Sequence, residues 1–320
     1  MKIKMIVAAY ILVIPLAEAI AATDSCYEYT QRKEYDRAID TCSSDIDSGK
    51  YSGSNLAYTY FYRGGAYFYK GDYDQAISDF NRAIELDSKH ASAYYNRGLG
   101  YGRKGDYDRA ISDFNRAIEL NPKYALAYCN RGAAYGRKGN YGRAISDYSK
   151  ALELNPKDAY PYNKRGNDYY DKGDYERAIA DYNKAIELDP KYEYTRIRLL
   201  LTLRKVSKER ANSYLQEFKT YVNSNSQSSW VRSISKYYLK MDDLTEKGVL
   251  EEARRGKDDQ EVRGQLCEAY YYLGEEQLWK GNRKGAKEYF QKSVMTNLYG
   301  FVEYQAAKAE LKKMNVRFIR

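Results

Sequence analysis

One 34-residue unit recurs four times in succession between residues 57 and 192. The stretch NRGLGYGRKGDYDRAISDFNRAIELNPKYA, which begins at Asn96, returns 34 residues later as NRGAAYGRKGNYGRAISDYSKALELNPKDA. A single unit of this length cannot bury its own apolar face, so neighbouring copies must stack and cover one another. We therefore expect a solenoid of repeated units over this part of the chain.

Large and small residues occupy fixed positions of the unit, counted with Ala57 as position 1. Aromatic residues stand at positions 4, 11 and 24, glycine at position 8, and alanine at positions 20 and 27. These spacings place them on one face of two successive helices, where small residues allow close approach and aromatic rings fill space. Each unit is thus predicted to be an all-α helical hairpin.

The segment KGDY or KGNY lies between the two predicted helices of each copy. Its glycine can adopt the left-handed conformation that ends a helix, and the next residue, Asp or Asn, can cap the following helix. The predicted helix-ending glycines are Gly71, Gly105, Gly139 and Gly173, and the predicted caps are Asp72, Asp106, Asn140 and Asp174.

This pattern closely resembles the tetratricopeptide repeat (TPR), which implies stacked hairpins in a right-handed superhelix over residues 57–192. Weaker copies flank the four repeats: a shortened repeat over 22–56, and a TPR-like repeat with a capping helix over 263–320. Residues 193–262 are helical in pattern but out of register, and we expect this divergent region to bend the solenoid or to separate two lobes.

The shortened first repeat places Cys26 at position 8 and Cys42 at position 24, two positions that face each other across a hairpin. In an oxidising compartment we predict a disulfide between them, closing a loop of about 15 residues and contributing roughly 3 kcal/mol. Two buried free thiols are the alternative.

Residues 1–21 are predicted to be a secretory signal peptide. Lys2 and Lys4 precede the apolar run 5–16, and the small-residue segment AEAIAA follows. Pro15 and Glu18 interrupt the run, which argues against the alternative of a retained membrane anchor. Cleavage is expected after Ala19, Ala21 or Ala22. No cysteine follows a lipobox-like triplet, so we expect an exported protein, periplasmic or secreted, without a stable membrane or lipid anchor.

The segments YEYTRIRLLL, WVRSISKYYL and RGQLCEAYYYLGEEQLWKGNRKGAKEYFQKSVMTNLYGFVEYQAAKAEL lie within residues 193–311. They resemble the C-terminal part of bacterial TPR adaptors of the new-lipoprotein-I type. The resemblance implies a periplasmic adaptor that brings envelope hydrolases and a protease together, and it makes a homodimer plausible. The missing lipobox departs from that family.

The TPR resemblance implies that the first helix of each repeat lines a concave groove. Asn96 and Asn130, at position 6, are expected to hold peptide amides, although asparagine there is also a common structural choice. Arg103, Arg137 and Lys164 favour an acidic segment or a C-terminal carboxylate. The other expected groove residues are Tyr58, Phe61, Tyr62, Tyr95 and Tyr160, which offer side-chain pockets, and Asn163 and Asn167.

Two regular ladders of opposite charge run through the repeats, arginine at position 7 and aspartate at position 23. We predict structural ion pairs between the two helices of each hairpin, and an arrayed anion site is the alternative. The arginines are Arg63, Arg97, Arg131 and Arg165, and the aspartates are Asp79, Asp113, Asp147 and Asp181.

The sequence offers little for catalysis, because it contains a single histidine among 320 residues and no phosphate-binding or nucleophile motif. His90 is expected to be exposed, Cys129 to line the groove, and Cys267 to be packed or free. We therefore predict no enzyme activity, cofactor, metal site or nucleic-acid partner. The predicted function is a protein-binding scaffold of the cell envelope. Because the net charge is +9, a binding protein for cell-wall glycan or another anionic polymer is the alternative.

Overall fold

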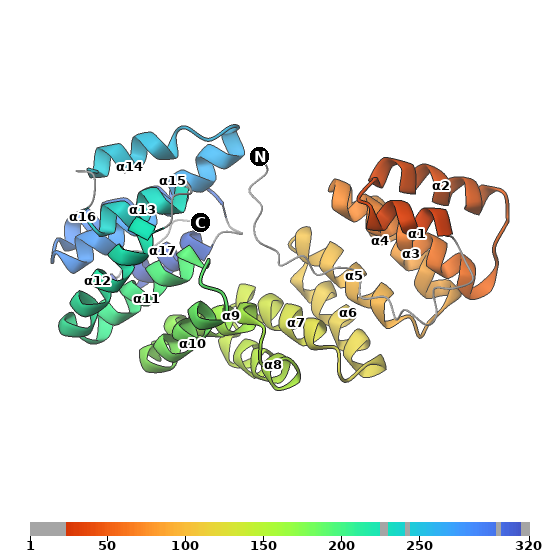
Figure 1. Ribbon diagram of the computed structural model, residues 1–320, viewed down its shortest axis with the longest axis horizontal. Coiled ribbons are helices and arrows are strands. Elements are labelled where there is room, and N and C mark those ends of the chain that lie inside the picture. Colours follow the sequence, from red (N-terminus) through yellow and green to blue (C-terminus); the bar gives the residue numbers. More distant parts are fainter. Residues whose placement is uncertain (1–23, 225–229, 241–243, 299–301, 315–320) are drawn as a thin grey trace. The chain divides into compact units, whose positions relative to one another are not determined.

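The computed structural model describes residues 24–224, 230–240, 244–298 and 302–314. These residues form seventeen α-helices and no β-strand, which confirms the predicted all-α fold of helical hairpins (Figure 1). The predicted signal peptide and residues 225–229 of the polar break NSNSQSSW lie outside the described residues. Among the described helices, none is both long and apolar enough to cross a membrane.

The chain divides into two compact units between Pro161 and Tyr162. We call them the N-terminal unit, described from residue 24 to 161, and the C-terminal unit, described from residue 162 to 314. The N-terminal unit contains α1 (Asp24–Gln31), α2 (Tyr35–Asp47), α3 (Gly53–Lys70), α4 (Tyr73–Leu86), α5 (Ala91–Arg103), α6 (Tyr107–Leu120), α7 (Ala125–Arg137), α8 (Tyr141–Leu154) and the start of α9 (Ala159–Asp171).

The helix ends in the N-terminal unit follow the predicted turn chemistry. Gly71 has a φ of 90°, in the left-handed region, where it ends α3. Asp72 then caps α4, because its side chain accepts a hydrogen bond of 3.2 Å from the backbone N–H of Gln75. The same pair of residues separates the helices of the following copies, with caps from Asp106 and Asn140 in this unit and from Asp174 in the C-terminal unit.

The glycine at position 8 is where the two helices of a hairpin come closest. A Cβ atom added at Gly98 would lie 2.9 Å from Cε1 of Phe114 and 3.2 Å from the carbonyl oxygen of Ala110. Because both neighbours belong to the facing helix α6, an added methyl group would push the hairpin apart. The predicted combination of small and aromatic residues is thus confirmed at this position.

We predict that Gly98→Ala lowers the free energy of unfolding, although alanine is the better helix former. Overpacking costs about 1–3 kcal/mol, which exceeds the gain of about 0.5–1 kcal/mol in helix propensity. Gly102 is the matched control, because it lies in the same helix and an added Cβ would meet nothing within 4 Å. In urea titrations Gly102→Ala should be more stable than the wild type and Gly98→Ala less stable; equal gains would contradict the steric account.

The arginine and aspartate ladders form the predicted ion pairs within each hairpin. Arg97 donates two hydrogen bonds to Asp113, from Nε to Oδ2 (2.8 Å) and from Nη2 to Oδ1 (2.6 Å). The third guanidinium nitrogen, Nη1, donates to Oδ1 of Asn81 in the preceding repeat (2.7 Å). Burial raises the pKa of Asp113, and the hydrogen bonds from Arg97 oppose that rise. The ladder is structural, and it also joins neighbouring repeats.

The shortened first repeat contains the predicted disulfide. Cys26 of α1 and Cys42 of α2 are bonded, with their Cα atoms 5.4 Å apart and both side chains buried. They form a hydrophobic cluster with Phe61, Tyr62 and Phe80 of the next repeat. The disulfide therefore fixes a hairpin that covers one end of the stack.

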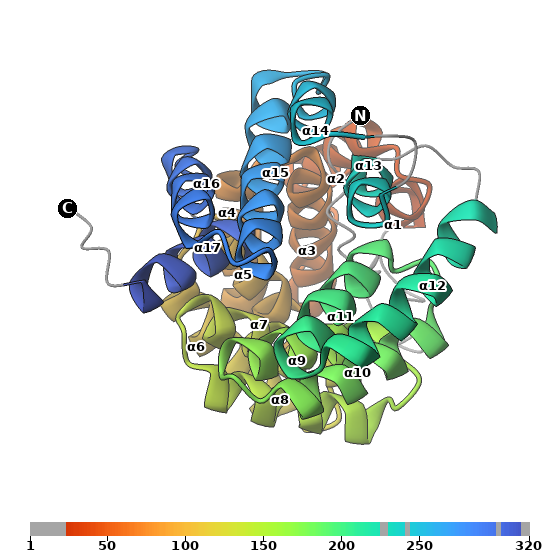
Figure 2. The ribbon, with the colours of Figure 1, turned by 90° about the vertical axis from the view of Figure 1, so that its left-hand side faces the viewer.

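The C-terminal unit is a second set of packed helices (Figure 2). It has its own hydrophobic core. Gly274 and Phe290 repeat the close approach seen in the N-terminal unit, and Asn282 caps the second helix through the N–H of Gly285 (3.0 Å). Besides the end of α9, the helices are α10 (Tyr175–Leu188), α11 (Glu193–Val206), α12 (Lys208–Ser224), α13 (Trp230–Tyr238), α14 (Glu246–Ala253), α15 (Asp259–Trp279), α16 (Arg283–Met295) and α17 (Val302–Lys313).

The divergent region is part of this core, and it does not mark the division between the two units. Residues 195–203 of α11 are all buried, and Leu199, Leu200 and Leu201 pack in one cluster with residues of α10, α15 and α17. The division instead falls inside α9, upstream of residue 193. The nine consecutive buried residues take in the whole circumference of α11, so other helices cover it on several sides.

Candidate functional site

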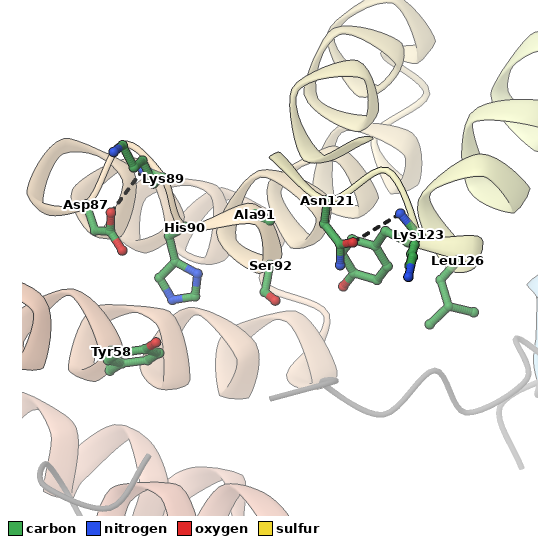
Figure 3. A pocket seen from close by; sticks show the side chains of 10 residues that line it. Tyr58, Asp87, Lys89, His90, Ala91, Ser92, Asn121, Lys123 and Leu126 are labelled. Atoms are coloured by element: carbon green, nitrogen blue, oxygen red, sulfur yellow. Dashed lines mark hydrogen bonds between the residues drawn. The ribbon is translucent and has the colours of Figure 1, made fainter. Parts of the chain in front are cut away.

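A hollow of about 340 Å³ lies in the N-terminal unit where α3 meets the segments that lead into α5 and α7 (Figure 3). Its wall combines aromatic, aliphatic and charged side chains, so it offers both apolar contact and hydrogen bonding. The lining residues are Tyr58, Asp87, Lys89, His90, Ala91, Ser92, Asn121, Lys123, Tyr124 and Leu126.

Two lysines and one aspartate, Asp87, line this hollow, so its lining carries a net positive charge. Lys89 and Lys123 are exposed, and neither forms an ion pair with any residue that the structure describes. Their backbone N–H groups donate to Asp87 Oδ1 (2.9 Å) and Asn121 Oδ1 (3.1 Å), respectively, which orders the two turns (Figure 3). The ammonium groups therefore remain available to an anionic group in the hollow.

The starts of α5 and α7 add to this positive character. Both helices have 13 residues, and the residues that precede them, His90 and Tyr124, make no side-chain capping hydrogen bond. The second helices of the same hairpins, α6 and α8, begin with the capping residues Asp106 and Asn140 instead. An uncapped helix start favours negative charge, so an acidic group is better suited to the hollow than a basic one.

Asn96 and Asn130 lie one turn beyond the hollow, on α5 and α7. Each side chain donates a hydrogen bond of 2.9 Å back to its own helix, to the carbonyl of Ser92 and of Leu126, respectively. Asn130 also donates to the hydroxyl oxygen of Tyr95 (3.0 Å). The Oδ1 atoms of both residues accept no hydrogen bond from the described residues, so each can accept one from a peptide N–H.

Three aromatic residues expected to form groove pockets lie in the core instead. Phe61 and Tyr62 are 1% exposed and Tyr95 is 3% exposed. Phe61 packs on His90 with ring centroids 4.8 Å apart, and Tyr95 packs on Tyr124 at 4.9 Å. His90 and Tyr124 occupy position 34, the last residue of a repeat, and they cover position 5 of the same repeat. The prediction of open pockets at these three aromatic residues is therefore wrong.

Two further expectations about exposure are also wrong. His90 is 8% exposed, because its ring packs against Tyr58 and Phe61. Cys129, expected to line the groove, is 1% exposed and belongs to a cluster with Ala144 and Tyr148. Cys267 is buried, in agreement with one of the two expectations for it.

The remaining predicted groove residues of the N-terminal unit keep accessible surface. Tyr58 is half-buried beside His90, and the guanidinium of Arg103 lies 6.0 Å from the ring centroid of Phe68. Arg137 and Tyr160 are half-buried. Their predicted role in binding a peptide stays a prediction.

Three predicted groove residues, Asn163, Lys164 and Asn167, belong to the C-terminal unit. Asn163 donates to the hydroxyl of Thr195, and Asn167 accepts a hydrogen bond of 2.9 Å from the hydroxyl of Tyr182. These bonds link α9 to α10 and α11, so both asparagines have structural partners. Lys164 is half-buried.

The sequence interpretation missed the lysines at position 33 and the residues at position 34. Lysine recurs at position 33 in every repeat, as Lys89, Lys123, Lys157 and Lys191, and this regularity was a usable signal. Position 34 varies, with histidine, tyrosine and aspartate, so no pattern indicated that it would cover position 5. Within the described residues, no three His, Cys, Asp or Glu side chains are placed to hold a metal ion.

Comparisons with known proteins agree with this architecture. Residues 64–105 and 101–139 match the family model of the TPR repeat, and residues 125–158 and 159–192 match that of the tetratricopeptide repeat. No curated protein sequence matches the chain.

One of the similar solved structures shows the same fold over most of the chain, and two others align with about half of it. A tetratricopeptide repeat protein from Parabacteroides merdae ATCC 43184 aligns over 90% of this chain and 97% of its own, with a TM-score of 0.57 and 16% identity. MamA from residue 41 to its end, from Desulfovibrio magneticus RS-1, aligns over 54% of this chain and 97% of its own, with a TM-score of 0.50 and 22% identity. YrrB, described as a TPR protein with an unusual peptide-binding site, aligns over 56% of this chain and 91% of its own, with a TM-score of 0.48 and 22% identity.

Proposed function

Because residues 64–192 consist of tetratricopeptide repeats, we propose that this protein is a non-enzymatic scaffold that binds an extended acidic segment of another protein. The segment runs along α5 and α7 of the N-terminal unit. The observation that carries the proposal is the hollow with two unpaired lysines, Lys89 and Lys123, next to two asparagine side chains with open acceptor atoms.

The parts of the surface have distinct roles in this proposal. The Oδ1 atoms of Asn96 and Asn130 accept hydrogen bonds from backbone N–H groups, which holds the segment extended. A carboxylate of the segment enters the hollow between Lys89 and Lys123, where two helix starts also favour negative charge. Tyr58 supplies apolar contact at the edge of the hollow.

We further propose that the protein works after export, in the bacterial periplasm or outside the cell. The Cys26–Cys42 disulfide supports this location, because disulfides persist in oxidising compartments. The partners that we propose are envelope hydrolases and a protease, as the resemblance of the C-terminal part implies. This part of the proposal is tested by the identity of the captured partners.

The first test is site-specific photocrosslinking in the producing cell. A photoreactive residue is placed at Leu126 on the wall of the hollow or at Asn96, and at the exposed Arg116 on α6 as the control. Discrete envelope proteins captured from Leu126 and Asn96 but not from Arg116 support the proposal. Equal capture from all three positions contradicts it.

The alternative function, binding of a cell-wall glycan or another anionic polymer, is favoured by the same unpaired lysines. The crosslinking experiment separates the two, since it yields either protein or glycan adducts. Salt separates them as well, because a polymer that contacts many basic groups loses affinity steeply as the salt concentration rises.

We predict that replacing both groove asparagines weakens binding of the captured segment. Each lost hydrogen bond removes about 0.5–1.5 kcal/mol, so Asn96→Ala with Asn130→Ala should raise Kd by about tenfold. Fluorescence anisotropy with a synthetic peptide of the captured segment measures this, with Arg116→Ala as the matched control.

A second pair of variants separates a loss of peptide binding from a loss of folding. The side chains of Lys89 and Lys123 form no hydrogen bond or ion pair with a described residue, so in Lys89→Gln and Lys123→Gln circular dichroism should stay unchanged while peptide affinity falls. A peptide with glutamine in place of glutamate has no carboxylate for the lysines. It should therefore bind to these variants and to the wild type with equal affinity. Unchanged affinity in both pairs of variants would refute the proposed binding mode.

A further inference from the structure

The carboxyl group of the half-buried Glu268 lies between two aromatic side chains in the C-terminal unit. Oε2 of Glu268, on α15, accepts hydrogen bonds from the hydroxyl of Tyr194 (2.6 Å) and from Nε1 of Trp230 (2.7 Å). Tyr194 is 36% exposed, and Trp230 and Glu268 are half-buried. These residues come from α11, α13 and α15, so the packing of three helices fixes the orientation of the carboxyl group.

The second oxygen of this carboxyl group has no partner among the described residues. Oε1 of Glu268 accepts no hydrogen bond there, and Glu268 forms no ion pair with a described lysine or arginine. Arg198 is the basic residue with electrostatic influence on Glu268, but its guanidinium pairs with Glu303 of α17 at 3.7 Å. The site thus has one more acidic group than it has cations.

The surroundings of Glu268 disfavour its ionised form as long as no cation is added. Burial and the negative charge of Glu303 raise the pKa of Glu268 to about 8, against the hydrogen bonds from Tyr194 and Trp230 and the charge of Arg198. The other titratable groups that face it are Cys267 and Tyr272 of α15. A positive charge at Oε1 would relieve this unfavourable environment.

We propose that Glu268, Tyr194 and Trp230 form a binding site for a basic side chain, lysine or arginine, of a partner protein. Oε1 of Glu268 accepts a charge-assisted hydrogen bond from the cation, and the two aromatic rings contact the alkyl stem and the positive charge. A neutral or acidic group would leave the carboxyl group without a counter-ion. The site lies in the C-terminal unit, and its test does not depend on the acidic-segment site of the N-terminal unit.

The proposal predicts stronger binding at higher pH. Glu268 must be ionised to hold a cation, so the fraction of competent protein, and with it the affinity, falls roughly tenfold for each pH unit below its pKa of about 8. Lysine keeps its charge to about pH 10, so the ligand does not change over this range. Affinity should therefore rise from about pH 6 to pH 8 and level off above it.

The probe is a short blocked peptide with one central lysine flanked by glycine and serine, and its matched control carries norleucine instead. Norleucine has an apolar chain of similar length without the charge, so it separates a cation site from a hydrophobic patch. Binding to the full-length protein is followed by tryptophan fluorescence, and Trp230→Phe shows whether the signal comes from this site. We expect a saturable response with the lysine peptide and none with the norleucine peptide.

Substitution at Glu268 tests the role of the carboxyl group. Glu268→Gln keeps the shape and the two hydrogen bonds to Oε2 but removes the charge, so it should weaken lysine-peptide binding about tenfold or more and abolish the pH dependence. Glu288→Gln, at an exposed position of α16, is the matched control and should bind as the wild type does. Equal binding of the norleucine peptide, or unchanged affinity in Glu268→Gln, would overturn the proposal.

Discussion

Arg97→Leu should lower the free energy of unfolding by about 3–5 kcal/mol, the effect of removing one partner of a buried ion pair. Asp113 is 5% exposed, and both of its carboxylate oxygens receive hydrogen bonds from Arg97. Without the guanidinium, the aspartate would carry an uncompensated charge in the interior. Chemical denaturation monitored by circular dichroism measures the loss.

The control is the double variant Arg97→Leu with Asp113→Leu. Replacing both partners removes the buried charge, so most of the lost stability should return. The single variant should also respond to pH. The pKa of Asp113 is already raised by burial, and it rises further without Arg97, so the folded state takes up a proton more readily than the unfolded state. The difference in unfolding free energy between the wild type and Arg97→Leu should therefore become smaller as pH falls from about 7 to about 5. A double variant as unstable as the single one would contradict this account.

Loss of the Cys26–Cys42 disulfide should lower the stability of the first hairpin by about 3 kcal/mol. The two cysteines are 16 residues apart, and cross-linking them restricts the unfolded chain. The expected result is faster amide hydrogen exchange in α1 and α2 of Cys26→Ala with Cys42→Ala, while α5 to α8 exchange as in the wild type. Contacts between neighbouring repeats dominate a solenoid, so the effect should remain local.

The redox state gives an independent check of the same bond. The chain has four cysteines, so the protein unfolded without reductant should expose two reactive thiols, Cys129 and Cys267, and four after reduction. Four reactive thiols before reduction would show that the disulfide does not form.

The helices and their pairing could be predicted from the sequence, because they depend on short-range chemistry. The spacing of Gly98 and Phe114 indicated a close helix contact, and the structure places a hypothetical Cβ of Gly98 2.9 Å from the ring of Phe114. The regular positions of Arg97 and Asp113 likewise predicted the ion pair. In each case equivalent residues recur every 34 positions, so a contact between two helices that is predicted for one repeat is predicted for every copy.

The candidate site could be predicted only in part. Asn96 and Asn130 are half-buried, and their role in binding stays a prediction, whereas Phe61, Tyr62 and Tyr95 were expected to form open pockets and are buried. Their burial depends on rings from other segments, such as Tyr124 packed on Tyr95 and Tyr27 packed on Tyr62. The spacing of residues within one helix contains no information about these covering rings.

By itself, then, the sequence determined the helical hairpins, their ion pairs and the disulfide, because each follows from residues at fixed spacing along the chain. Only the tertiary structure decided which side chains remain accessible, and it alone brought Tyr194, Trp230 and Glu268 together from three helices. The divergent region has no repeat to set its register. Its packing is therefore decided by how α11, buried around its circumference from residue 195 to 203, is covered by helices distant in sequence.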